Sequence, residues 1–145
     1  MAIRPFTSAD IPAALELWRC TEGMGLGDVD NPAALAGYLA RNPGLSVVAE
    51  VGDRLVGAAL CGHDGRRGYL YHVAVAAAQR GQGLGRALVQ ACLDGLARAG
   101  ISRCHLFVFN ANEDGLAFWE HQGWLRRGDL AVFSHDIEVE RVSTP

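Results

Sequence analysis

The chain has 145 residues, of which 50% are hydrophobic and 20% are charged, and its net charge is −3. This length supports one hydrophobic core and is too short for two domains of ordinary size. The acidic balance argues against a nucleic-acid partner, and no apolar run is long enough to span a membrane. The four cysteines form no C-x-x-C pair, so we expect no metal and a reducing, cytoplasmic location.

Helix signals dominate the first forty residues. The segment Thr7–Asp10 resembles a capping box before an amphipathic helix, and a glycine-rich acidic loop, 22–30, follows that helix. Asn31-Pro32 predicts the start of a second helix, which we expect to run to about Arg41. Acidic loops are usually only solvated, but this one could attract a cationic substrate.

Strand signals follow, and then helix and strand alternate. The expected elements are strands at 45–50 and 54–61 around a Gly52-Asp53 turn, a strand at 69–75, a helix from Leu84 to Gly100, a buried strand at 104–109, a short helix from Asp114 to Gly123 and a last strand at 130–133. We expect one domain over residues 1–136, followed by a polar tail over 137–145.

The most informative stretch is 80–85, which reads Arg-Gly-Gln-Gly-Leu-Gly between a strand pattern and a helix pattern. Glycines at alternate positions allow a ligand to approach the backbone closely. The following helix turns its free N–H groups and the positive end of its dipole toward the same place. The stretch therefore predicts a cradle for phosphate or diphosphate.

Two common phosphate motifs do not fit this stretch. A P-loop requires Lys-Ser or Lys-Thr after its last glycine, whereas this chain continues with Arg86. The dinucleotide fingerprint spaces its glycines as G-x-G-x-x-G, whereas Gly81, Gly83 and Gly85 occupy every second position.

At every defined position, 80–85 resembles the acyl-CoA loop of the GNAT superfamily of N-acetyltransferases, Gln/Arg-x-x-Gly-x-Gly/Ala, which follows a strand ending like Val73-Ala74-Val75. A second segment, Asn112 with 117–124 (Ala-Phe-Trp-Glu-His-Gln-Gly-Trp), resembles the family's N…(A)xFYExxGF segment. The resemblance covers about residues 2–133 and is closest to the short bacterial YpeA-type members.

The resemblance implies an α/β (α+β) GNAT fold, with a mixed sheet of about six to seven strands flanked by four helices and splayed between strands 4 and 5. It also implies acetyl-CoA as co-substrate, with its pantetheine arm on the fourth strand and its diphosphate on the glycine turn. The implied coenzyme-binding residues are Val73, Ala74, Val75, Arg80, Gly81, Gln82, Gly83, Leu84, Gly85, Arg86, Asn112 and Trp119.

The family chemistry is direct attack of an amine on the thioester in a ternary complex, with a backbone N–H near Val75 holding the oxyanion. Here Trp119 stands where the family's acid is usually Tyr, and an indole has no titratable proton to give. Tyr71 or Tyr69, which alternate onto one face of the fourth strand, could replace it. Cross-strand packing is an equally open interpretation of both tyrosines.

The general base is also open. Phe107 lies near the strand-five position where some family members carry Glu, which leaves Glu50, His72 and His63 as candidates. An imidazole has the intrinsic pKa best suited to this task. Strict strand alternation, however, turns His72 away from Tyr71 unless a bulge intervenes. The catalytic candidates are thus Tyr71, His72, Glu50 and Trp119.

Two functions remain open. The first is an N-acetyltransferase that acts on a primary amine of a small molecule, protein or peptide, and the alternative is a weak or inactive acyl-CoA-binding module with a sensing or partner-binding role. An α-amine is the easier acceptor, because neutralising it at pH 7.4 costs roughly 0.5 kcal/mol against about 4 kcal/mol for a lysine-like amine. We expect no nucleic-acid or membrane partner, and a homodimer is left open.

Overall fold

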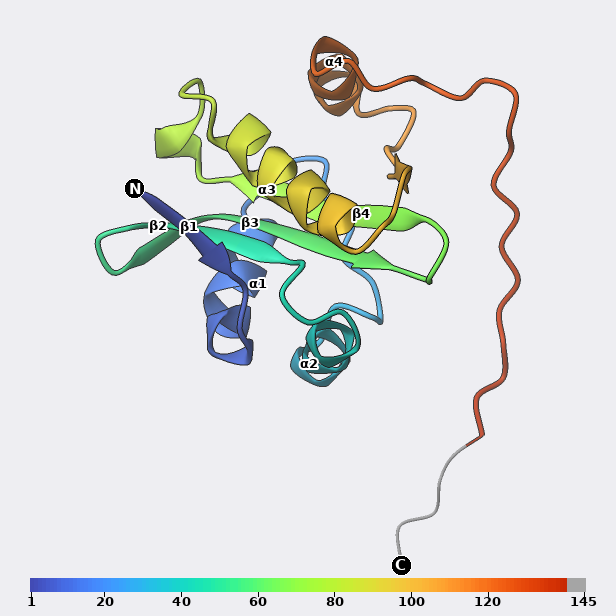
Figure 1. The fold of residues 1–145 in the computed structure, drawn as a ribbon, viewed down its shortest axis with the longest axis horizontal. Coiled ribbons are helices and arrows are strands. Elements are labelled where there is room, and N and C mark those ends of the chain that lie inside the picture. Colours follow the sequence, from blue (N-terminus) through green and yellow to red (C-terminus); the bar gives the residue numbers. More distant parts are fainter. Residues whose placement is uncertain (141–145) are drawn as a thin grey trace, which may run out of the picture.

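The computed structural model describes residues 1–140 and contains a five-stranded mixed sheet with helices on both faces (Figure 1). Neighbouring strands in the sheet follow chain order, the first four are antiparallel, and the fifth runs parallel to the fourth. The strands are β1 (Ala2–Pro5), β2 (Val47–Val51), β3 (Arg54–His63), β4 (Gly68–Val75) and β5 (Cys104–His105).

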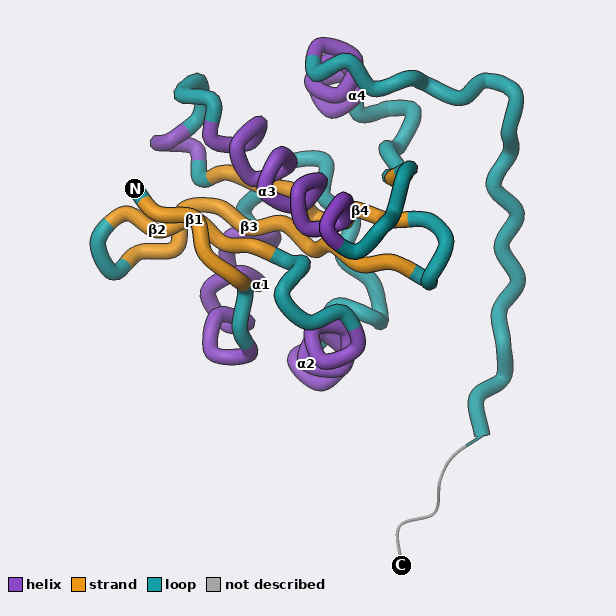
Figure 2. The backbone as a smooth tube through the Cα atoms, in the orientation of Figure 1, coloured by secondary structure: helices purple, strands orange, loops and turns teal. Residues whose placement is uncertain are grey.

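Four α-helices surround this sheet. They are α1 (Ile11–Arg19), α2 (Pro32–Arg41), α3 (Leu84–Arg98) and α4 (Glu113–His121), and short 3₁₀ turns precede α1 (Ser8–Asp10) and α3 (Ala77–Gln79). Helices α1 and α2 lie on one face and α3 on the other, while the described chain from residue 125 to residue 140 runs away from the body as an extended segment (Figure 2). No helix within residues 1–140 combines the length and the apolar character that crossing a bilayer requires.

Local capping explains where the helices begin. Thr7 N donates to an Asp10 carboxylate oxygen over 2.9 Å, which starts the turn leading into α1, and Ala34 N donates to Asn31 Oδ1 over 2.9 Å at the start of α2. Both starts were predicted from the sequence and are confirmed.

Each face of the sheet has its own apolar cluster. Helix α3, which was expected after the glycine turn, buries Leu84, Leu88, Cys92 and Leu96 against the sheet. Gly57 of β3 lets α3 approach closely, since a Cβ there would lie 2.9 Å from Leu88 Cδ1. On the opposite face, Trp18 of α1 is fully buried against residues of β3 and β4. Two independent clusters therefore hold β3 and β4 in place from both sides.

The predicted fold class is confirmed, but the sheet has five strands and not six to seven. The predicted strand at 104–109 ends at His105, and Phe107 is 60% exposed. The predicted strand at 130–133 is absent, and Phe133 is 95% exposed. Both segments lack a neighbouring strand to pair with, and an isolated strand cannot satisfy its backbone hydrogen bonds. Of the expected tail at 137–145, residues 141–145 lie outside the described part of the chain.

Candidate functional site

The sheet opens between β4 and β5. The two strands pair only at Gly68 with Cys104 and at Tyr69 with His105, after which they part. The stretch from Leu70 to Val75 consequently has one edge without a β5 partner. Such an edge presents N–H and C=O groups that can pair with an extended ligand.

The glycine turn lies directly after this open stretch. Gly81 and Gly83 have φ of 81° and 79°, a conformation that favours glycine, and no atom lies within 4 Å of where a Cβ would stand at either residue. Gly83 is the N-cap of α3, so the exposed backbone of the turn faces the positive end of that helix. The arrangement suits a diphosphate.

Other residues of the turn have different surroundings. Leu84 is buried in the core, so only its backbone can reach a ligand, whereas Gln82 and Arg86 are exposed. Arg80 folds back, and its Nε donates to the carbonyl of Val75 over 3.1 Å. Gly85 lets the Phe118 ring of α4 pack closely, since a Cβ at this glycine would lie 3.4 Å from that ring.

The acidic loop at 22–30 meets both sides of the opening. A Cβ on Gly23 would lie 2.8 Å from Asn112 Nδ2, and one on Gly25 would lie 2.8 Å from the ring of Phe109. Asn112 itself caps α4, because its Oδ1 accepts from Gly115 N over 3.0 Å. At its other end this loop contacts β4 through Asp30.

A β-bulge sits in the middle of β4. Ala58 of β3 pairs with Ala74, whereas Leu60 pairs with Tyr71, so β4 carries one extra residue over this interval. His72 takes up the irregularity with φ of 53°, and no other non-glycine residue of 1–140 has positive φ. The sequence left open whether a bulge interrupts the fourth strand, and the structure contains one.

The bulge places two successive side chains on one face of the sheet. The ring of Tyr71 lies 6.3 Å from that of Tyr38 on α2, and the ring of His72 lies 5.0 Å from that of Trp18 on α1. Strict alternation would have turned His72 toward α3. Tyr71 and His72 thus share the face covered by α1 and α2.

His72 is held by contacts from two elements. Its Nε2 lies 2.8 Å from Asp30 Oδ1, and its carbonyl accepts a 2.8 Å hydrogen bond from Trp18 Nε1. The second carboxylate oxygen of Asp30 accepts from Gly27 N over 2.8 Å. The side chains of His72 and Asp30 are only 16% and 7% exposed. Asp30, which the sequence suggested was solvated, is thus a partner of His72.

Two other base candidates lie in different surroundings. Glu50 is on β2, two strands from β4, where it pairs with Arg4. His63 ends β3, and its Nδ1 accepts from Gly65 N over 2.9 Å within the turn that follows. Neither is in contact with the open stretch of β4.

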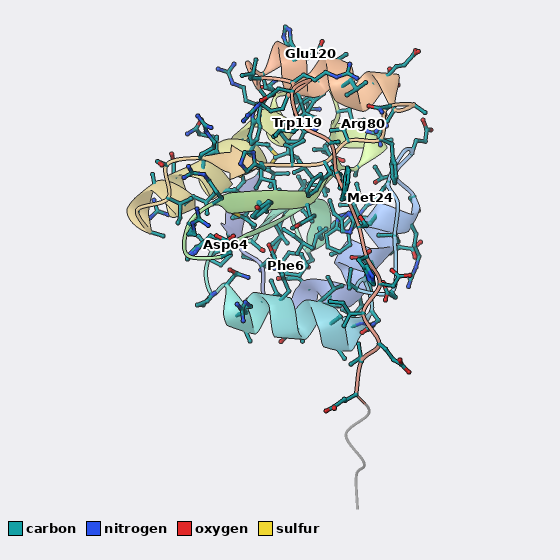
Figure 3. All side chains as sticks on the ribbon, turned by 90° about the vertical axis from the view of Figure 1, so that its right-hand side faces the viewer. Phe6, Met24, Asp64, Arg80, Trp119 and Glu120 are labelled. Carbon is teal, nitrogen blue, oxygen red and sulfur yellow. The ribbon has the colours of Figure 1, made fainter. Side chains whose placement is uncertain are left out.

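Aromatic residues line both ends of the opening. Tyr71 stacks on Tyr69, which in turn stacks on Phe107 at 6.5 Å, and burial raises the pKa of the Tyr71 phenol. Trp119 packs edge-on against Phe118 at 4.9 Å and is part of the cluster on the α3 face. In Figure 3, Trp119 and Arg80 both lie on the α4 side of the sheet.

Comparison with known proteins shows which family the chain belongs to. Residues 11–124 match the model of the acetyltransferase (GNAT) family. The chain belongs to the GNAT family. An acetyltransferase of Photorhabdus laumondii is 32% identical over 142 residues, which cover 97% of this chain and 99% of the relative.

Solved structures agree with the GNAT fold. The PaiA N-acetyltransferase of Thermoplasma acidophilum, solved in complex with coenzyme A, has a TM-score of 0.73 at 16% identity and covers 83% of this chain and 87% of its own. The ribosomal-protein-S18-alanine N-acetyltransferase of Escherichia coli has a TM-score of 0.69 at 22% identity, over 84% of this chain and 76% of that one. At these identities the likeness shows the fold alone.

GNAT membership confirms the family expected from 80–85 and from the segment after Asn112, and it makes acetyl transfer the general reaction of this chain. Within residues 1–140, no three His, Cys, Asp or Glu side chains are grouped so that they could hold a metal ion. The contact of Asp30 with His72 had no signal in the sequence, because 42 positions separate the two residues.

Proposed function

We propose that the protein moves the acetyl group of acetyl-CoA to a primary amine by direct attack in a ternary complex. The observation that carries this proposal is the junction of the open β4 edge with the left-handed glycine turn at the start of α3. An extended arm and a diphosphate are the two parts of coenzyme A that such a junction can bind. The bound coenzyme A of the PaiA structure supports the choice of ligand.

The coenzyme's two parts would meet different groups. The arm would pair with the backbone of 73–75, and the diphosphate would accept hydrogen bonds from the N–H groups of 81–85. The exposed cation of Arg86, with Gln82 beside it, would face the phosphates, and Arg80 would have to leave the Val75 carbonyl to join them. Asn112 and Trp119 would border the arm from the α4 side.

The reaction requires charge stabilisation and two proton movements. A strand-four N–H near Val75 would hold the oxyanion, a contribution typically worth about 10²–10³ in rate. Tyr71 would protonate the departing thiolate, because burial raises the pKa of its phenol and keeps it neutral and able to donate. Trp119 would contribute shape and stacking only, and Glu50 leaves the set because it is paired with Arg4.

We favour an α-amine as the acceptor, within the wider class of small-molecule and peptide amines. An α-amine loses its proton near neutral pH with little free energy, so it makes the smallest demand on a base. The Escherichia coli neighbour, whose name specifies an alanine acceptor, supports this choice.

The test is Gly83→Glu, which adds a Cβ at φ of 79° and a carboxylate in the phosphate position. The matched control is Gly65→Glu, which has φ of 90° and an equally open surrounding, but in the turn between β3 and β4. Calorimetry should give at least about 100-fold weaker coenzyme A binding for Gly83→Glu and unchanged binding for the control. Equal affinity in both variants would rule out the site.

Turnover separates the enzyme from a binding module. The wild-type protein is incubated with acetyl-CoA and Ala-Gly-Ala amide, and thiol release is followed together with the mass of the acetylated peptide. Acetyl-peptide formation supports the transferase. Tight coenzyme A binding without transfer to this or any other amine would favour the module.

A further inference from the structure

We infer that His72 is the base that takes the proton of the acceptor amine and that Asp30 is the residue that positions it. The inference rests on the proposed acetyl transfer and adds the groups that prepare the amine. It starts from one contact, the 2.8 Å between His72 Nε2 and Asp30 Oδ1.

The backbone at His72 is specialised for this placement. A non-glycine residue with φ of 53° is uncommon, and such conformations persist where the surroundings impose them, often at functional sites. Here the Trp18 indole N–H holds the carbonyl of His72, and the Trp18 ring packs against the imidazole. Without the bulge the imidazole would face the α3 core, away from the α1–α2 face on which Tyr71 lies.

The carboxylate of Asp30 is itself held in position. Gly27 N occupies its Oδ2, which leaves Oδ1 for the imidazole. A carboxylate that accepts from Nε2–H selects the tautomer with the lone pair on Nδ1. His72 is thus presented as a base whose free nitrogen is Nδ1.

The surroundings of the His72 imidazole come from three elements. Helix α1 contributes the uncharged ring of Trp18 and the 22–30 loop contributes Asp30, while Tyr71 is the preceding residue on β4. Within residues 1–140, the charged side chain that contacts the His72 imidazole is that of Asp30. An imidazolium formed during the reaction would be stabilised by that carboxylate.

In the proposed reaction the acceptor ammonium loses two protons and the departing thiolate gains one. The acceptor ammonium gives one proton to His72 Nδ1, and the free amine forms an N–C bond to the thioester carbonyl. The C–S bond breaks, coenzyme A leaves as the thiolate, and the thiolate takes up a proton from Tyr71. The amide nitrogen loses its second proton, which restores the Tyr71 phenol through solvent, and His72 returns its own proton to solvent. The products are the acetamide, free coenzyme A thiol and one released proton.

A purely structural role makes different predictions. If the contact only tied the loop to β4, its loss would lower stability or coenzyme affinity and leave the pH dependence of turnover unchanged. If the loop only attracted cations, Asp28 would matter as much as Asp30. Asp28 is exposed and lies two residues away, so Asp28→Asn removes an equal charge without touching His72.

The experiment compares wild type, His72→Gln, Asp30→Asn and Asp28→Asn, with Ala-Gly-Ala amide and Nα-acetyl-lysine amide as acceptors between pH 5.5 and 9. We expect His72→Gln to lower kcat/KM by about 10²–10⁴ and to remove the acid limb of the profile, with coenzyme A affinity unchanged. Asp30→Asn should lower kcat by at least about tenfold, because the imidazole loses the carboxylate that fixes its tautomer and its orientation. Asp28→Asn should match wild type.

A second measurement does not depend on turnover. Nitrogen-15 NMR of the histidine side chains should give the Nε2–H tautomer for His72 in wild type and a weaker preference in Asp30→Asn. If the acid limb of the wild-type profile is still present in His72→Gln, or if His72 carries its proton on Nδ1, the inference is overturned. The proposed acetyl transfer still stands in that case. A wild type that binds coenzyme A but acetylates neither probe overturns the proposed function, and the inference with it.

Discussion

Residues 1–100 and residues 101–140 are packed to very different degrees. Every buried hydrophobic side chain of the described chain, from Phe6 to Leu96, lies in the first region, and no residue of the second region is buried. The first region contributes four antiparallel strands with helices on both faces, whereas the second contributes a two-residue strand and one helix. The glycine turn and His72 belong to the first region, so one wall of the opening is firmly supported.

The second region meets the first through half-buried side chains, and those that pack against the α3-face cluster are Ile101, Cys104, Leu106, Trp119 and Trp124. The ring of Phe118 lies against Gly85, Asn112 lies against Gly23, and Phe107 stacks on Tyr69. The contacts of Phe118, Asn112 and Phe107 border the opening between β4 and β5. The glycine turn therefore rests on the buried core, whereas the α4 side of the opening is held by half-buried contacts.

The largest difference between the two regions should appear in the free energy of unfolding when one leucine in each region is truncated to alanine. Leu88→Ala empties a fully buried position between α3 and the sheet and should cost about 2–5 kcal/mol of unfolding free energy. Leu125→Ala, at a position 83% exposed, should change it by less than about 0.5 kcal/mol. Urea unfolding of both variants measures the contrast, and equal costs would contradict it.

Two tryptophans should differ by a smaller margin. Trp18→Phe leaves the partly buried His72 carbonyl without its 2.8 Å donor, which should cost about 1–3 kcal/mol. Trp119→Phe keeps an aromatic ring in a half-buried cluster and should cost less than about 1 kcal/mol. Thermal unfolding followed by near-UV circular dichroism would show the order, and a reversed order would mean that α4 is the better packed element.

Each region also has an Arg–Asp pair. The Arg4 guanidinium holds the pKa of Asp10 below its usual range, so the stabilisation by this carboxylate is complete above about pH 4 and is lost as the pH falls through the lower folded-state value. Asp10→Asn should cost about 1 kcal/mol at pH 7, the usual worth of a cap, and should flatten the acid side of the stability curve.

The pair of Arg127 with Asp129 is the control for that prediction. This pair lies on the surface and is screened by salt, although Arg127 lowers the pKa of Asp129 as well. Asp129→Asn should leave the stability curve between pH 2 and 8 unchanged. A flattened acid side in this variant too would show that the two pairs are equivalent.

The smallest effect is expected in the extended segment after α4. Phe133→Ser removes the most exposed large apolar side chain within residues 1–140 and should change the unfolding free energy by less than about 0.5 kcal/mol. A larger loss that grows with protein concentration would mean that a second copy covers this segment, and the comparison between the two regions would then hold only for the monomer.

Much of the site follows from local rules that the sequence displays. The glycine turn, the cap at Asn31 and the start of α3 at Leu84 depend on residues within a few positions of one another, and each was predicted where the structure has it. The strand expected over 104–109 was wrong beyond His105, because apolar content indicates burial but does not supply a neighbouring strand.

The amino-acid order by itself determined the family, the glycine turn and the starts of the helices, since a positive φ at glycine and a capping side chain are properties of a few adjacent residues. The tertiary structure alone decided which way His72 points and which group it meets. That outcome depends on an extra residue in the pairing of β4 with β3 and on a carboxylate 42 positions away, and only the packing of α1 and its loop against the sheet brings these together.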